Sequence, residues 1–157
     1  MTDTALRDVM ATIPNGACPI EGVGTAGQPS EGAWRELARA GYRSVVDLRA
    51  ADEPRGHDEL AAVREAGLEY LPLPVTQATL DDAAFDRFRD IMRDPAHRPI
   101  VVHCATSNRV GALLLPYFAL DEQRPLGEAV PLAQRAGLRS PELAAIALDY
   151  ARRHGAR

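Results

Sequence analysis

The chain has 157 residues, of which 46% are apolar and 25% are charged, and these values are ordinary for one globular domain with a sizeable core. Its net charge of −4 gives no electrostatic reason to expect binding to nucleic acid or to an anionic membrane. All 18 basic residues are arginine, and the absence of lysine excludes Schiff-base chemistry, a lysine general base and a nucleotide-binding P-loop lysine.

Apolar runs alternate along the chain with segments of helical period. The expected strands are 42–48, 68–73 and 99–103, and the expected helices lie near 31–40, 57–66, 80–93, after Cys104, near 126–136 and after Ser140. Ser30 and Ser140 are expected to be N-caps, and the segment from Thr79 to Asp82 resembles a capping box. Alternating strands and helices imply an α/β fold, with a mostly parallel central sheet flanked by helices.

The first part of the chain contains a pattern that imitates a nucleotide-binding motif. Residues 1–18 are expected to be a loose lead-in within a single domain that covers 1–157. The segment 22–27 fits G-x-G-x-x-G, and Asp47 follows about 20 residues later. The residues before it contain no buried strand, however, and Gln28-Pro29 delays the next helix. We therefore interpret 22–27 as a turn and a short edge strand.

The strongest chemical signal is the segment IVVHCATSNRVG, residues 100–111. An apolar strand ends at His103-Cys104, a short polar loop follows, and Arg109 opens a helix. The N–H groups of such a loop and the positive end of the helix dipole converge on one point. This field favours the thiolate form of Cys104, and Arg109 can bind a phosphate with two hydrogen bonds. The alternative is a buried, unreactive cysteine beside a surface arginine.

The N-terminal residues and the cysteine count predict the compartment. Residues 1–8 are acidic and lack the apolar segment of a signal peptide, and no run has the roughly 18 apolar residues of a membrane span. We therefore expect a cytoplasmic protein without a structural disulfide. Cys18 is interpreted as a buried or incidental thiol, with a resolving partner for Cys104 as the alternative. No metal or cofactor is expected, because metal-ligand spacing is missing among His57, His97 and His154.

His103-Cys104, a short loop and Arg109 together resemble the active-site loop of the cysteine-dependent protein tyrosine and dual-specificity phosphatases. The closer likeness is to a bacterial branch, the phosphatase-like domain of the β-lactamase-hydrolase-like family. That branch also has a Gly-Gln-Pro-Ser segment, here 27–30, and an Ala-Gly-aromatic, strand, Leu-Arg passage, here 40–49. The likeness runs from about residue 12 to 120 and implies a fold like that of protein tyrosine phosphatases.

The resemblance also implies roles for single residues. Cys104 would be the nucleophile that forms a phosphocysteine, and Arg109 would stabilise the phosphoryl oxygens. His103 is expected to orient the loop and stabilise the thiolate, with a packed strand-end histidine as the alternative. Asp47 and Arg49 lie at the carboxyl end of a strand and are candidates for lining the pocket, with a structural salt bridge as the alternative. The loop amides that would complete the phosphate cradle are those of Ala105, Thr106, Ser107, Asn108 and Arg109.

Two features of the loop depart from the main group of phosphatases. Four residues separate Cys104 from Arg109 instead of five, a spacing that also occurs in rhodanese-like sulfurtransferases and in the bacterial branch. Ser107 stands where glycine is usual, and a positive φ there would cost a serine about 1 kcal/mol. Val110 stands where many phosphatases carry a hydroxyl that helps the thiolate leave, and Thr106 or Ser107 would have to substitute for it.

The general acid is the least evident part of the site. The superfamily places an aspartate in the loop after the second strand, and aligning 70–73 with that strand puts Gln77 near the expected position. Asp81 and Asp82 follow closely and are the candidates, with favourable charge at a helix N-terminus as their alternative role. Loss of leaving-group protonation lowers a rate by about 10²–10⁴-fold.

The sequence therefore predicts a cysteine-dependent phosphomonoester hydrolase that acts on a phosphorylated protein or small molecule. A rhodanese-like sulfurtransferase that works through a Cys104 persulfide is the first alternative. A non-catalytic reader of phosphate or phosphoprotein is the second. No nucleic acid or membrane partner is expected, and no oligomeric state is predicted.

Overall fold

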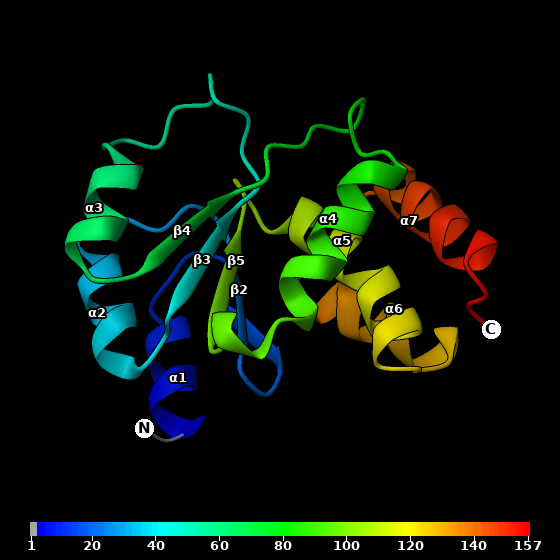
Figure 1. Cartoon of the computed structure of the whole chain (residues 1–157), viewed down its shortest axis with the longest axis horizontal. Helices are drawn as coiled ribbons and strands as arrows, with labels where there is room; N and C mark the ends of the chain where they lie inside the picture. The colour runs from blue at the N-terminus through cyan, green and yellow to red at the C-terminus, as the bar shows by residue number, and fades with distance from the viewer. Residues whose placement is uncertain (1–2) are drawn as a thin grey trace.

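The computed structural model describes residues 3–157, which form a five-stranded sheet between two layers of helices (Figure 1). The strands are β1 (Ala17–Ile20), β2 (Val23–Ala26), β3 (Ser44–Asp47), β4 (Glu69–Pro72) and β5 (Ile100–His103). They lie in the order β1-β2-β5-β3-β4, and only β1 runs antiparallel to its neighbour. The predicted α/β class with a mostly parallel sheet is confirmed.

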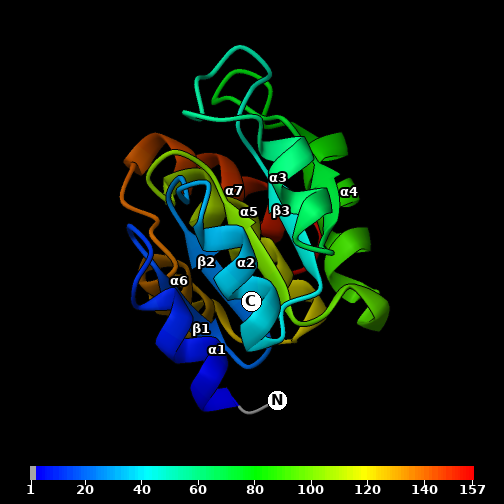
Figure 2. The ribbon, with the colours of Figure 1, turned by 90° about the vertical axis from the view of Figure 1, so that its left-hand side faces the viewer.

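The helices divide between the two faces of the sheet (Figures 1 and 2). One face carries α1 (Asp3–Met10), α2 (Ala33–Ala40) and α3 (Glu59–Glu65). The other carries α4 (Asp82–Arg93), α5 (Asn108–Pro116), α6 (Leu126–Arg135) and α7 (Pro141–Arg153). A 3₁₀ turn (Pro95–His97) precedes β5, and a π-helix (Tyr117–Asp121) continues α5. Within residues 3–157, none of the helices has the length and apolar character needed to cross a bilayer.

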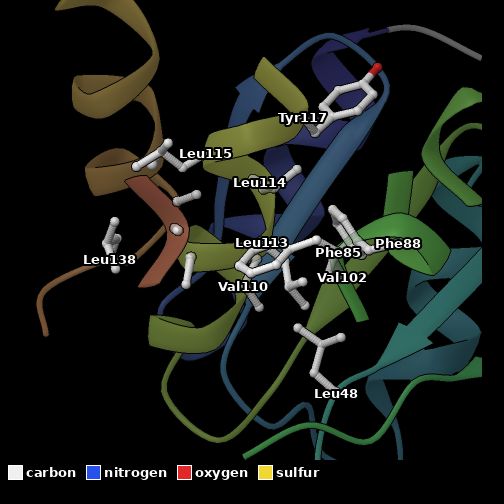
Figure 3. Packing of buried hydrophobic residues seen from close by; sticks show 14 of the residues in the cluster. Leu48, Phe85, Phe88, Val102, Val110, Leu113, Leu114, Leu115, Tyr117 and Leu138 are labelled. Atoms are coloured by element: carbon white, nitrogen blue, oxygen red, sulfur yellow. The ribbon is translucent and has the colours of Figure 1, made fainter. Parts of the chain in front are cut away.

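Alternate residues of the central strands point to different cores, because successive side chains of a strand face opposite sides. Val45 and Val101 belong to the core under α1, α2 and α3. Val46 and Val102 belong to the larger core, which Figure 3 shows around α5. All residues of α5 from Val110 to Pro116 are buried, as is typical of a helix that neighbours surround on every side.

The expectation that residues 1–18 form a loose lead-in is wrong for the part that the structure describes; residues 1–2 lie outside it. Helix α1 packs Leu6 and Met10 into the core, and β1 pairs with β2. Strand β2 is also not an edge strand, since it lies between β1 and β5. Gly24 explains why the sequence pattern indicated neither the packing of α1 nor the inner position of β2. A Cβ there would lie 2.8 Å from the Met10 sulfur, so this glycine lets α1 approach the strand without adding an apolar side chain to the sequence pattern.

The N-termini of three helices show where the prediction of caps succeeded and where it failed. Ser140 caps α7 as predicted, because its hydroxyl accepts a hydrogen bond from Leu143 N–H at 3.2 Å. Ser30 does not cap α2, which begins after Gly32 without a side-chain cap. The predicted box at 79–82 is shifted, since Asp81 is the N-cap of α4 and accepts from Ala84 N–H.

The carboxyl ends of β3, β4 and β5 meet at one edge of the sheet. Asp47 lies in register with both His103 and Pro72. The loops that follow these strands therefore gather at this edge, at the top of Figure 1. Ligands bind at this edge in open sheets of this kind.

Candidate active site

Cys104 follows β5 directly and is buried, with 1% of its surface exposed. Its backbone N–H donates to the carbonyl of Ala26 at 3.3 Å, and Thr106 bridges to Gly27 across the loop. Gly27 is required at this crossing, because a Cβ there would lie 2.7 Å from the Ala105 carbonyl oxygen. The loop of residues 104–107 therefore runs from the buried Cys104 to α5, which begins at its far end.

Ser107 adopts the left-handed conformation, with φ of 69° and ψ of 2°. The φ is positive at this position, so the serine carries the strain that a glycine would avoid. Its buried hydroxyl donates to the Ala136 carbonyl, a contact that compensates part of this strain. Gly137 lies so close that a Cβ would be 2.5 Å from the Ser107 carbonyl oxygen. Since this hydroxyl is engaged, Thr106 is the loop residue whose hydroxyl remains exposed.

The segment between α6 and α7 braces the other side of the loop. The Asn108 side-chain oxygen accepts hydrogen bonds from the N–H groups of Arg139, at 2.8 Å, and Ser140, at 3.1 Å. The Arg139 guanidinium donates to the Thr106 carbonyl at 2.8 Å. Local sequence patterns do not indicate these contacts, because they join positions about 30 residues apart.

Arg109 is held by a bidentate ion pair with Glu53. Its Nη1 and Nη2 atoms each lie 2.8 Å from a Glu53 oxygen, and Nη1 also donates to the Val75 carbonyl. The hydrogen bonds to Glu53 raise the pKa of Arg109, burial opposes this rise, and the neighbouring Cys104 adds to it. A guanidinium has five N–H donors, so its Nε and Nη2 edge remains for an anion. Glu53 thus fixes the direction of Arg109 and leaves this edge for a ligand.

Glu53 is itself placed between two arginines. The hydrogen bonds from Arg109 lower the pKa of Glu53 to about 2, with further contributions from Ala50 N–H and the charge of Arg49. Arg49 Nε lies 3.3 Å from Glu53 Oε1, and Arg49 Nη1 donates to the Gln28 side chain at 3.1 Å. The carboxylate is therefore ionised at neutral pH.

His103 lies fully buried in a cluster beneath the loop. Its Nδ1 faces the carbonyl of Cys104 at 3.2 Å, and its Nε2 faces Glu59 Oε2 at 2.7 Å. A carbonyl oxygen only accepts, so Nδ1 donates the hydrogen bond to Cys104. Asp47 Oδ1 also lies 3.6 Å from Nε2. His103 therefore connects the loop to α3 and to the end of β3, and the orienting role expected of it stays a prediction.

Asp47, another member of this cluster, has a pKa below its ordinary value. Burial alone would raise the pKa of Asp47, but the charge of His103 and hydrogen bonds from Arg55 and Tyr70 bring it below the ordinary value. The alternative interpretation of Asp47 as a structural salt bridge describes its contacts, because Arg55 Nε donates to it at 2.7 Å.

Asp47, Glu59 and His103 also place three possible metal-ligand atoms within 4.8 Å of one another. Each carboxylate oxygen, however, already accepts a hydrogen bond from the protein. The donors are Arg49 N–H, Arg55, Tyr70, Gln28 and His103. We interpret the cluster as a hydrogen-bonded support of the loop.

An open pocket of about 460 Å³ lies over the loop. Its lining residues are Ala50, Asp52, Glu53, Thr76, Gln77, Thr106, Asn108, Arg109 and Leu143. Gln77, from the loop after β4, is among the residues that line this pocket. Arg49 instead lines a neighbouring pocket of about 440 Å³, together with Arg55, His57 and Tyr70.

The two aspartates proposed as general acids have other partners. The Asp81 carboxylate caps α4, and both oxygens of Asp82 bind the Arg153 guanidinium at 2.7 and 2.8 Å. Neither residue lines the pocket over the loop. Glu53 and Glu59 were missed, although the i,i+4 spacing of Arg49 with Glu53 and of Arg55 with Glu59 was visible in the sequence.

Comparison with known proteins gives the family. Residues 22–123 match the family described as "DSP-PTPase phosphatase fused to NAD+ Kinase". A β-lactamase hydrolase-like protein of Xylella fastidiosa is 36% identical over 106 residues, which are 65% of this chain and 23% of that protein. The chain therefore spans about a quarter of the length of this curated relative.

Solved structures of other proteins share the fold. The DUF442 protein of Shewanella putrefaciens CN-32 superposes with a TM-score of 0.79 and 21% identity, over 94% of this chain and 98% of that one. TpbA of P. aeruginosa, a variant solved in complex with phosphotyrosine, gives a TM-score of 0.64 and 21% identity, over 88% and 81% of the two chains. The predicted resemblance to the bacterial phosphatase-like branch is confirmed. This chain belongs to the DSP-PTPase phosphatase family, within the superfamily of protein tyrosine phosphatase-like proteins.

Proposed function

We propose that this protein hydrolyses phosphomonoesters through a phosphocysteine intermediate on Cys104. The observation that carries the proposal is the arrangement of Arg109, whose Nη1 and Nη2 end is occupied by Glu53 while its Nε and Nη2 edge stays available beside Cys104. Two N–H donors on one edge of a guanidinium match two oxygens of a phosphoryl group. The loop amides at the start of α5 add further donors to the same anion.

The reaction needs two displacements at phosphorus. The Cys104 thiolate attacks, so that an S–P bond forms while the P–O bond to the leaving group breaks and the leaving oxygen takes up a proton. Water then attacks the phosphocysteine, which releases inorganic phosphate and restores the thiolate. Negative charge on the equatorial oxygens in both steps is stabilised by Arg109 and the loop amides. Thr106 is the exposed hydroxyl in the loop that could assist the departure of the thiolate.

The substrate class we propose is an aryl or other accessible phosphomonoester on a protein or small molecule. The pocket over the loop is open, and polar groups of Thr106, Asn108 and Gln77 contribute to its lining. The phosphotyrosine complex of TpbA, a protein of the same fold, supports a phosphorylated side chain as one candidate substrate.

A paired assay tests this proposal. Wild type, Cys104→Ser and the control Cys18→Ser are assayed for p-nitrophenyl phosphate hydrolysis and for thiosulfate:cyanide sulfur transfer. We expect phosphate release by wild type and Cys18→Ser, and none by Cys104→Ser, which keeps the hydroxyl but lacks the thiolate. Thiocyanate formation without phosphate release would identify a sulfurtransferase, the reaction that the four-residue spacing between Cys104 and Arg109 also suits. Phosphate binding without either turnover would identify a phosphate reader.

A further inference from the structure

The proposed reaction requires a proton donor for the leaving oxygen, and the structure leaves few candidates. The wall of the pocket that follows β4 presents Thr76 and Gln77, neither of which is acidic. Asp81 and Asp82 are engaged with the start of α4 and with Arg153, outside this pocket. The acid must therefore come from another loop if the site contains one.

Two carboxyl groups line the pocket over the catalytic loop, and both come from the segment between β3 and α3. Glu53 uses both of its carboxylate oxygens to hold Arg109, so it is not free to reach a leaving group. Asp52 is exposed, and within the described residues its side chain has no hydrogen bond or ion pair. Asp52 is thus the one carboxyl in this lining that is not used to hold an arginine.

The backbone around Asp52 is fixed even though its side chain is free. A turn brings Glu53 N–H to the carbonyl of Ala50 at 3.0 Å, and the Glu53 carboxylate accepts from Ala50 N–H at 2.6 Å. Arg55 closes the base of the segment, since it donates to Asp47 and to the carbonyls of Arg49 and Ala50. Asp52 therefore lies at the tip of an anchored turn, on the same pocket as Arg109.

We propose that Asp52 is the general acid of this site, a role that rests on the proposed phosphatase activity. As the P–O bond breaks, the proton of the Asp52 carboxyl moves to the leaving oxygen. In the second step the Asp52 carboxylate accepts a proton from the attacking water as the S–P bond breaks, which restores the acid. The proton is thereby returned in each cycle, and no further reactant is needed.

The test compares Asp52→Asn with wild type on two phosphate esters of different leaving groups. Phenol is a poor leaving group and needs protonation, whereas p-nitrophenolate leaves readily without it. The kcat/KM, which reports formation of the phosphocysteine, should fall by about 100-fold or more for phenyl phosphate. The kcat/KM of Asp52→Asn should fall much less for p-nitrophenyl phosphate. The decline of kcat/KM on the alkaline side of the pH optimum, expected in wild type, should disappear in Asp52→Asn.

Matched variants make the outcome specific. Asp81→Asn and Asp82→Asn should keep the wild-type ratio of kcat/KM for the two esters, and Asp52→Glu should recover part of the lost rate. Because Asp52 is exposed and unpaired, Asp52→Asn should melt at the wild-type temperature, which separates a catalytic loss from unfolding. Equal loss on both esters, or no loss, would overturn the assignment of Asp52.

The outcomes distinguish a failure of the role of Asp52 from a failure of the proposed phosphatase function. A leaving-group-dependent loss in Asp81→Asn or Asp82→Asn would move the role to that aspartate and also overturn the proposal for Asp52. If wild type releases no phosphate that depends on Cys104 from either ester, the phosphatase function itself is wrong, and the role of Asp52 fails with it.

Discussion

Replacing Glu53 with glutamine removes the charge that holds Arg109 while keeping the size of the side chain. In wild type the two terminal nitrogens of Arg109 lie 2.8 Å from the two carboxylate oxygens. Glutamine offers only one oxygen, and its amide N–H groups face a guanidinium that is also a donor. We expect Glu53→Gln to weaken both the stability of the fold and the orientation of Arg109.

The size of the stability loss follows from the pKa of Glu53. A pKa of about 2, against an ordinary value of 4.5, corresponds to at most about 3 kcal/mol at pH 7. Because 25% of the Glu53 side chain is exposed, solvent screening reduces this to about 1–2 kcal/mol. Loss of one charge-assisted hydrogen bond to Arg109 is worth a similar amount, so kcat/KM should fall by about tenfold or more.

The stability loss should depend on pH in a definite direction. The pKa of Glu53 is lower in the folded than in the unfolded chain, so the stabilisation is complete above about pH 4.5 and is lost as the pH falls toward about 2. Urea unfolding of wild type and Glu53→Gln between pH 7 and pH 3 measures this window. Asp82→Asn, which removes an exposed pair with Arg153, is the control and should change stability little. A difference between wild type and Glu53→Gln that is zero at pH 7, or the same at every pH, would refute the reasoning.

Two further predictions concern Ser107 and the cysteines. Ser107→Ala should destabilise the fold by about 1–2 kcal/mol, since it loses the hydrogen bond to Ala136 but keeps the positive φ. Ser107→Gly should be nearly neutral, because glycine removes the backbone strain while it also loses the hydrogen bond. Thermal unfolding measures both variants, and equal losses of stability would contradict this. Iodoacetamide at pH 7 should label Cys104 faster than Cys18, because burial raises the pKa of the Cys18 thiol. Peptide mass spectrometry measures both rates, Cys18→Ser is the control, and equal rates would disprove the difference.

Local patterns were sufficient where the structure depends on neighbouring residues. The apolar run before His103, the polar loop and the apolar helix after Arg109 are continuous in sequence, so the strand, loop and helix of the site were predicted from it. Their order along the chain implied the parallel sheet, because strands joined through helices run in the same direction. The comparison with glycine at position 107 likewise drew attention to the one loop residue that has a positive φ. The cytoplasmic location and the roles of single site residues stay predictions.

The partners of these residues were decided only by the tertiary structure. Glu53 lies 56 positions from Arg109, and Glu59 lies 44 positions from His103, so no local period links either pair. They meet because β3 and β5 are neighbours in the sheet and their carboxyl ends share an edge. The same holds for α1, which packs against β2 through a glycine that carries no apolar signal. The sequence by itself determined which reactive groups the loop carries, since those groups belong to adjacent residues. The tertiary structure decided which charges lie against them, since those pairs form only across the folded sheet.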